Sequence, residues 1–256
     1  AMLVEGQRAF NDGDFRQALD RWDRAADAYR ERGEAAAQAQ ALVGKGMAYL
    51  PLGRFPRAGA AMAEARELAA GAGDRALAMR AAIGQGSAQA LSGNPDGAKA
   101  LLEEALSATS AAGYRDLAAA AGLELGNILA EVGRSDQAVM HFRRSLADAD
   151  GVGDRALAAK AAVNLARALL SSDLGAEGWS VLTDADQRVR GLAASHDRGF
   201  LLVSVGGLYR TAADRALKQA DDALQRASRA FEAAAETARD VADRRTESYA
   251  LGHLGE

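Results

Sequence analysis

Apolar residues recur along this chain at the three- and four-residue spacing of an amphipathic helix, with short polar turns between the runs. The clearest early run ends before Gly33 and consists of Phe15, Ala18, Leu19, Trp22, Ala25, Ala26 and Tyr29. It follows a turn at Asn11-Asp12-Gly13-Asp14, where Asp14 can cap the first free amides of the helix. A shorter apolar run, residues 2–11, precedes this turn. The N-terminal stretch therefore predicts one helix-turn-helix unit.

Small residues repeat at an interval of forty residues in three independent sets. The sets are Gly13, Gly53, Gly93 and Gly133; Gly33, Gly73, Gly113 and Gly153; and Gly6, Gly46, Gly86 and Gly126, continued by Ala166 and Gly206. Each member of the first set is followed five residues later by an alanine. A shared period over this length identifies a repeat array. We interpret the first set as turns within units, the second as turns between units, and the third as points where helices cross.

The repeats predict an all-α fold, because alanine and other strong helix formers are abundant and there are only three prolines. The expected architecture is a right-handed α-α superhelix, or solenoid, of about six helix-turn-helix repeats with the last repeat truncated. One array over residues 1–256 is expected, with units near 2–33, 34–73, 74–113, 114–153, 154–194 and 195–242 and a partial unit at 243–256.

The regularity weakens towards the C-terminus. Gly178 stands where the preceding units have an alanine. The stretch from Asp214 to Asp243 has no interior glycine or proline, and its apolar residues lie seven apart at Leu217, Leu224, Phe231 and Ala238. This heptad pattern predicts one helix of about thirty residues over 214–243. The helix either packs on its own array or forms a seam for another chain.

The repeated small and aromatic positions carry a family resemblance. Gly46-x-x-Tyr49, followed by Ala58 and Ala65, resembles a tetratricopeptide repeat, as does Gly206-x-x-Tyr209. The unit is longer than that family's usual thirty-four residues, and extra helical turns would accommodate the difference. The forty-residue form and the segment 244–256 resemble bacterial proteins whose repeats precede a CHAT domain, a caspase-like cysteine protease module. This resemblance implies that the chain is a sensing or scaffolding region. It also implies that the cysteine and histidine of the protease lie beyond Glu256.

In the tetratricopeptide family, the first helices of the units line a concave groove that holds the partner. Counted from the aligned glycines, the resemblance implies that the groove residues are Gln40, Arg80, Asn127, Glu131, Lys160, Asn164, Arg167 and Arg210. Lys160, Asn164 and Arg167 share one helix face, where they could hold a peptide carboxylate by charge-assisted hydrogen bonds. The alternative for these three residues is a solvated polar face.

The composition of the chain argues against several classes of function. A net charge of −4 with both signs interspersed argues against nucleic-acid binding and gives no support for an anionic membrane surface. The absence of cysteine excludes thiolate nucleophiles and cysteine zinc sites, and it is compatible with the cytoplasm. His141, His196 and His253 fall in separate units, without the spacing of metal ligands. We therefore expect no catalytic residue, no metal and no cofactor, and no apolar run is long enough to span a membrane.

Several classes of function stay open at this point. The first is a non-catalytic scaffold that binds a protein or peptide and regulates a linked effector. The second is the repeat domain of a bacterial transcriptional regulator whose DNA-binding domain lies elsewhere. The third is self-association through the long helix. We expect a cytoplasmic location, and we interpret the chain as a fragment of a longer protein because it ends within a repeat unit.

Overall fold

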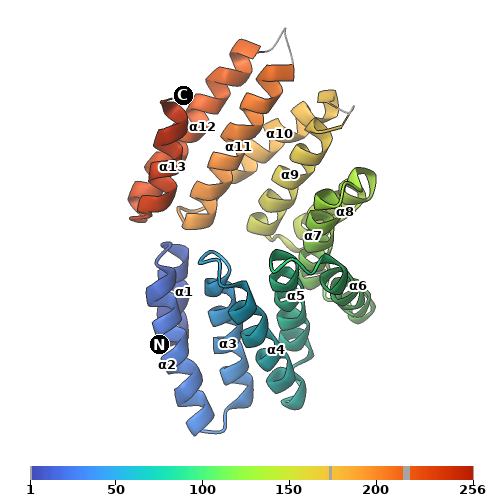
Figure 1. The fold of residues 1–256 in the computed structure, drawn as a ribbon, viewed down its shortest axis with the longest axis vertical. Coiled ribbons are helices and arrows are strands. Elements are labelled where there is room, and N and C mark those ends of the chain that lie inside the picture. Colours follow the sequence, from blue (N-terminus) through green and yellow to red (C-terminus); the bar gives the residue numbers. More distant parts are fainter. Residues whose placement is uncertain (1, 173–174, 216–219, 256) are drawn as a thin grey trace. The chain divides into compact units, whose positions relative to one another are not determined.

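A computed structural model describes residues 2–172, 175–215 and 220–255 (Figure 1). These residues form thirteen α-helices and no strand. The helices are α1 (Met2–Asn11), α2 (Phe15–Glu31), α3 (Ala35–Tyr49), α4 (Phe55–Gly71), α5 (Arg75–Leu91), α6 (Pro95–Ala112), α7 (Arg115–Glu131), α8 (Ser135–Val152), α9 (Arg155–Leu170), α10 (Gly175–Arg190), α11 (His196–Arg215), α12 (Ala220–Asp240) and α13 (Arg244–Leu254).

The turns form where the first two glycine sets predict them. All eight glycines of these sets have φ between 68° and 84°, a left-handed conformation that favours glycine because it has no Cβ. Several turns then restart a helix with a capping carboxylate. Asp14, Asp74 and Asp154 each accept a hydrogen bond of 3.0 Å from the backbone amide three residues later. Local sequence therefore determines where these helices end and begin.

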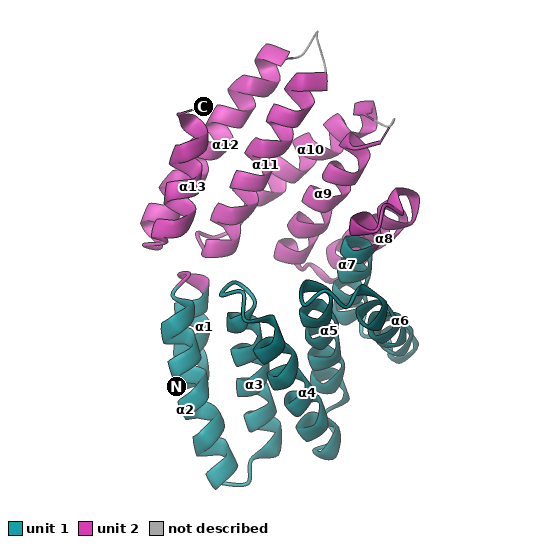
Figure 2. Ribbon diagram, in the orientation of Figure 1, with its two compact units in different colours: residues 1–10, 14–128 teal, residues 11–13, 129–256 magenta. Residues whose placement is uncertain are grey.

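The helices group into two compact units (Figure 2). Unit 1 comprises residues 1–10 and 14–128, and unit 2 comprises residues 11–13 and 129–256. Within unit 1, successive helices from α2 to α6 pack against one another, and α3 also packs against α5. Within unit 2, successive helices from α8 to α13 pack in the same way, and α11 also contacts α9 and α13.

The third glycine set marks close helix crossings. A Cβ added at Gly6 would lie 2.6 Å from Nε1 of Trp22, and one added at Gly46 would lie 2.7 Å from Cε of Met62. The same relationship holds for Gly86 with Leu102 and for Gly206 with Phe231. Real side chains essentially never approach a Cβ this closely, so only glycine allows these helices their observed separation. The predicted crossing role is confirmed at these positions.

The residues that fill the crossings form a series of their own, which the glycine spacing does not reveal. Trp22 also packs against Gly44, and Met62 also packs against Gly84, where an added Cβ would lie 2.5 Å and 2.7 Å from the respective side chains. Each large side chain therefore sits between a glycine of its own helix pair and one of the next pair. Buried residues continue this position at forty-residue intervals: Trp22, Met62, Leu102, Phe142 and Leu182.

The expectation of a single helix over 214–243 is wrong. Asp214 belongs to α11, and α12 begins at Ala220, ends at Asp240 and packs along α11. Asp243 caps α13 by accepting a hydrogen bond of 3.1 Å from the amide of Thr246. Ala242 has φ 57° and takes the left-handed turn position that glycine occupies in earlier units. Because Ala242 has a Cβ, this left-handed conformation costs more than it would for glycine.

The heptad residues of this stretch divide between the core and the surface. Phe231 and Ala238 are buried against their own unit, whereas Leu224 is exposed. Leu217 lies outside the described residues. Most of the apolar face of α12 is therefore covered by its own chain.

Candidate functional site

A cavity of about 700 Å³ opens in unit 1 between the first helices of successive pairs. Residues of α1, α2, α3 and α5 line it. Its polar lining residues are Gln7, Gln40, Asp74 and Arg80, and its larger apolar ones are Leu3, Val4, Trp22, Val43, Met47 and Leu77. The volume and the mixture of apolar walls with few polar groups are typical of a ligand site.

The repeat places two of the predicted groove residues in this cavity. Gln40 and Arg80 are forty residues apart, on equivalent turns of α3 and α5, and both line the cavity. Gly44 lies between them in the wall, where its lack of a side chain lets the indole of Trp22 reach the lining. The same glycine therefore allows both the helix packing and the shape of the cavity.

The two charged side chains of the cavity differ in the interactions they already make within the protein. Asp74 accepts the capping hydrogen bond from the amide of Leu77, so its carboxylate already serves the start of α5. Arg80 pairs with Asp116 at 3.6 Å, and both side chains are exposed. An exposed pair of this kind contributes about 0–1 kcal/mol, so exchange of Asp116 for a ligand carboxylate costs little. Arg80 is thus the cation best placed to bind an anionic group.

The apolar lining includes side chains that are open to solvent. Val4 is 72% exposed and Met47 is 36% exposed. Methionine adapts to irregular partners because its side chain is flexible and polarisable. An apolar ligand group would cover this surface.

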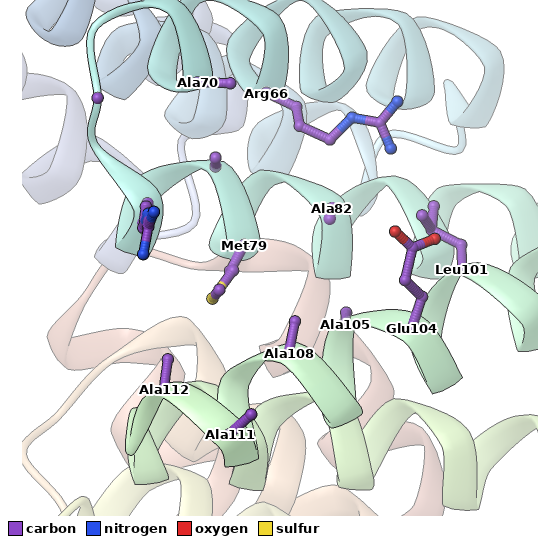
Figure 3. Close-up of a pocket in the computed structure, with 13 residues that line it drawn as sticks. Arg66, Ala70, Met79, Ala82, Leu101, Glu104, Ala105, Ala108, Ala111 and Ala112 are labelled. Carbon is purple, nitrogen blue, oxygen red and sulfur yellow. The ribbon is translucent and has the colours of Figure 1, made fainter.

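A second cavity of unit 1, of about 800 Å³, is lined by α4, α5 and α6 (Figure 3). Alanines make up most of its lining, and Figure 3 shows Ala105, Ala108, Ala111 and Ala112 following one another along α6. Arg66 and Glu104 are among its few charged residues. None of the groove residues predicted from the sequence lines this cavity.

The groove residues predicted on α7 are Asn127 and Glu131, and they line neither cavity of unit 1. Asn127 donates a long hydrogen bond of 3.5 Å from its side-chain amide to Glu124. Glu131 is the last residue of α7 and is exposed. Asn127 belongs to unit 1 and Glu131 to unit 2.

The remaining predicted residues lie in unit 2. Lys160 donates to Asp197 of α11 at 2.5 Å, and Asn164 is half-buried one turn further along α9. Arg167 is exposed as a residue, but neighbouring protein atoms remove water from its guanidinium and lower its pKa. Arg210 lies 3.3 Å from Nδ1 of His253 on α13.

The described residues contain no group of three or more histidine, aspartate or glutamate side chains that could hold a metal ion. In the same part of the chain, no helix is both long and apolar enough to cross a lipid bilayer. His196 is engaged with Asp243 at 2.5 Å.

Comparison with known proteins identifies the fold. No protein-family model matches the chain, and no curated protein matches its sequence. Among solved structures, the Rap conjugation gene regulator of plasmid pLS20 in complex with a Phr peptide is similar, with a TM-score of 0.75 and 16% identity over 99% of this chain and 73% of that chain. A Rap protein complexed with competence and sporulation factor has a TM-score of 0.72 and 12% identity, with the same coverage.

A third similar structure is a signal transduction ATPase with numerous domains and a tetratricopeptide repeat sensor, from Pyrococcus horikoshii. Its TM-score is 0.60 and its identity 14%, over 94% of this chain and 38% of that chain. At these identities the similarity establishes the fold alone. The chain therefore has an all-α, tetratricopeptide-like helical-repeat fold, which confirms the predicted fold class.

Proposed function

We propose that this chain is a non-catalytic module that binds a peptide or a protein segment, with the cavity lined by α1, α3 and α5 as its site. The observation that carries the proposal is the lining of this cavity. It combines the exposed apolar side chains of Val4 and Met47 with the polar groups of Gln40 and Arg80. Such a surface matches a peptide, which offers both apolar side chains and hydrogen-bonding groups.

Gln40 and Arg80 each have a task in this proposal. The side-chain amide of Gln40 can both donate to and accept from a peptide main chain. Arg80 can exchange its exposed partner Asp116 for an acidic group of the ligand. Val43 and Met47, on the same helix as Gln40, offer an apolar wall for a ligand side chain.

The comparisons support this class of function. Two of the similar structures are complexes, one with a Phr peptide and one with competence and sporulation factor. A helical-repeat fold of this kind therefore accommodates a bound regulatory molecule in other proteins. The absence of a catalytic arrangement is part of the proposal.

We also propose the more specific hypotheses on origin, location and linked effector that the sequence suggested. In them the module is bacterial and cytoplasmic, and it controls a linked effector, such as a caspase-like CHAT domain or a DNA-binding domain. Self-association through α12 is the weakest of them, because most of the apolar face of that helix is covered by its own unit.

A random library of displayed octapeptides, selected on the purified chain, tests the proposed site. We expect selected peptides to bind the parent chain and to bind Arg80→Ala and Met47→Glu variants at least about tenfold more weakly, since each removes a polar or apolar contact. Arg66→Ala is the matched control, because Arg66 lines the alanine-rich cavity instead. Equal binding by all four proteins would contradict the proposed site.

A further inference from the structure

The alanine-rich cavity of unit 1 lies on a different face of α5 from the cavity lined by α1, α3 and α5. Ala78 and Ala82 line the alanine-rich cavity, whereas Leu77 and Arg80 line the other one. Because a helix has 3.6 residues per turn, these two pairs point to opposite sides of α5. The second helices α4 and α6 both pack along α5 and supply the walls.

Small side chains leave this space open. Ala82 and Ala108 line the cavity, whereas the positions forty residues earlier hold Leu42 and Leu68. Leu42 is buried in a core cluster to which α2, α3 and α4 contribute, and Leu68 packs against that cluster. The earlier helices therefore fill the equivalent space with their own leucines, whereas alanine leaves about 800 Å³ here. A ligand for this cavity should supply the large apolar side chains that these positions lack.

The lining favours a helical ligand over an extended one. The apolar lining residues of α6 follow one another at intervals of four, three and four, the spacing of a helix face that packs on another helix: Leu101, Ala105, Ala108 and Ala112. A helix satisfies its own backbone amides and carbonyls. An extended segment would need hydrogen-bond partners for its backbone, and a lining made mostly of alanine side chains offers few.

Three charged residues of the lining have no ion-pair or hydrogen-bond partner for their side chains among the described residues. They are Arg66 on α4, Arg75 on α5 and Glu104 on α6. Figure 3 shows Arg66 and Glu104 on opposite walls of the cavity. By contrast, Glu103 pairs with Lys99 on its own helix. The three charges of the lining are therefore available to a ligand.

Contacts between the helices give the order of these charges. An added Cβ at Gly84 would meet Met62 on α4, and one at Gly86 would meet Leu102 on α6. Short turns make α5 antiparallel to both neighbours, so counting from these contacts places the charges along α5 in the order Glu104, Arg66 and Arg75. The first and last lie about 13 Å apart along the axis, at 1.5 Å per residue. The cavity thus has one acidic end and a longer basic part.

We propose that the alanine-rich cavity binds an amphipathic helix of a partner protein. Leucine or other large apolar side chains of this helix enter the space over Ala82 and Ala108. Its acidic side chains pair with Arg66 and Arg75, and a basic side chain pairs with Glu104. The class of partner rests on the proposed function, but the lining residues of this site are distinct from those of the cavity lined by α1, α3 and α5.

A library of displayed helices tests this proposal. Each helix has about sixteen residues, because isolated helices shorter than about 12–15 residues are marginal in water. Leucines stand at intervals of four, three and four on an alanine background, and lysine, glutamate or glutamine occupies the flanking positions. We expect the selected helices to bind the parent chain at least about tenfold more tightly than the Ala108→Leu variant, whose added side chain fills the space. Ala100→Leu is the matched control, because Ala100 is an exposed residue of α6 outside the lining.

Thermal unfolding followed by circular dichroism shows whether the variants remain folded. We expect Ala108→Leu to fold, because Leu68 occupies the equivalent position of α4. Weaker binding to a folded Ala108→Leu, with unchanged binding to Ala100→Leu, supports the proposal. Undiminished binding to a folded Ala108→Leu contradicts it.

A charge comparison tests the same site without changing its volume. Each selected helix is also made with its glutamates replaced by glutamine. We expect the parent chain to prefer the glutamate form by at least about threefold, since its charge pairs with Arg66 and Arg75. Arg66→Gln should reduce this preference, whereas Arg57→Gln, which removes an exposed charge of α4 outside the lining, should retain it. Equal reduction by the two variants would assign the preference to net charge and contradict the site.

Further measurements separate this proposal from the other cavity and from self-association. Met47→Glu should leave helix binding unchanged, because Met47 lines the cavity of α1, α3 and α5. Loss of helix binding in Met47→Glu but not in Ala108→Leu would overturn this site and retain that cavity. A library that yields no binding helix would overturn this site alone, since the octapeptide library tests the other cavity. A parent dimer in sedimentation that Ala108→Leu converts to monomer would assign the cavity to a second copy of the chain and overturn the partner helix.

Discussion

Trp22 on α2 packs so closely against Gly44 on α3 that a Cβ at position 44 would lie 2.5 Å from Cε2 of the indole. The indole also fills the crossing at Gly6, and it is almost fully buried. A rigid ring between two helix backbones has no room to yield. This contact joins the first helix pair to the second and shapes the cavity that Trp22 and Gly44 both line.

The Gly44→Ala variant should therefore be destabilised. The added methyl group overlaps the indole, and overpacking of this kind costs about 1–3 kcal/mol. Urea unfolding followed by circular dichroism measures the change. Gly71→Ala is the control, because no atom lies within 4 Å of its added Cβ, and helix propensity stabilises it by up to about 1 kcal/mol. A Gly44→Ala variant as stable as the parent would show that α3 moves away freely.

Two adjacent glycines of α11 offer a sharper comparison in unit 2. A Cβ at Gly206 would lie 2.6 Å from Cε1 of Phe231, whereas one at Gly207 meets no atom within 4 Å. We expect Gly206→Ala to lower the free energy of unfolding by about 1–3 kcal/mol. Gly207→Ala should instead raise it slightly, because alanine favours the helix by about 1 kcal/mol. Chemical denaturation of the two variants measures the change in the free energy of unfolding for each. Equal changes would contradict the close crossing at Gly206.

Asp154 should stabilise the start of α9 through its cap. Its carboxylate accepts from the amide of Leu157 at 3.0 Å. Replacement by alanine leaves that amide without its partner and should cost about 1 kcal/mol. Asp154→Asn retains a capping oxygen and should cost much less. Denaturant midpoints of the two variants make the comparison, and equal losses in both would assign the effect to charge instead of capping.

Asp243 should make the stability of unit 2 depend on acid. Burial by itself raises the pKa of this carboxyl, but hydrogen bonds from Thr246 and His196 outweigh that effect and lower the pKa below its ordinary value. Because the folded pKa lies below the unfolded pKa, ionised Asp243 stabilises the fold above about pH 4, and this stabilisation disappears as the pH falls through the folded pKa.

The Asp243→Asn variant tests this linkage. At neutral pH it should unfold at lower urea concentration than the parent, because the charge that stabilises the contact with His196 is lost. In acid the two midpoints should converge. Urea titrations near pH 6 and near pH 3 measure the two differences. A difference of the same size at both pH values would mean that folding does not lower the pKa of Asp243.

The sequence by itself determined the features that depend on neighbouring residues. The glycines at 13, 33 and their forty-residue equivalents specify left-handed turns, and Asp74 and Asp154 specify helix starts, because backbone conformation and capping act over a few residues. Repetition of these signals was sufficient to predict helix pairs and the fold class. Gln40 and Arg80 were placed on one surface by the same period, and they line one cavity.

Only the tertiary structure decided which side chains meet across helices. The fit of Trp22 between Gly6 and Gly44 and the fit of Phe231 against Gly206 depend on packing between residues far apart in the chain. The start of α12 also escaped prediction, because Asp214, which the heptad pattern placed in the same helix, belongs to α11. A local pattern carries no information on such contacts, since the shapes of both partners determine how closely two helices approach.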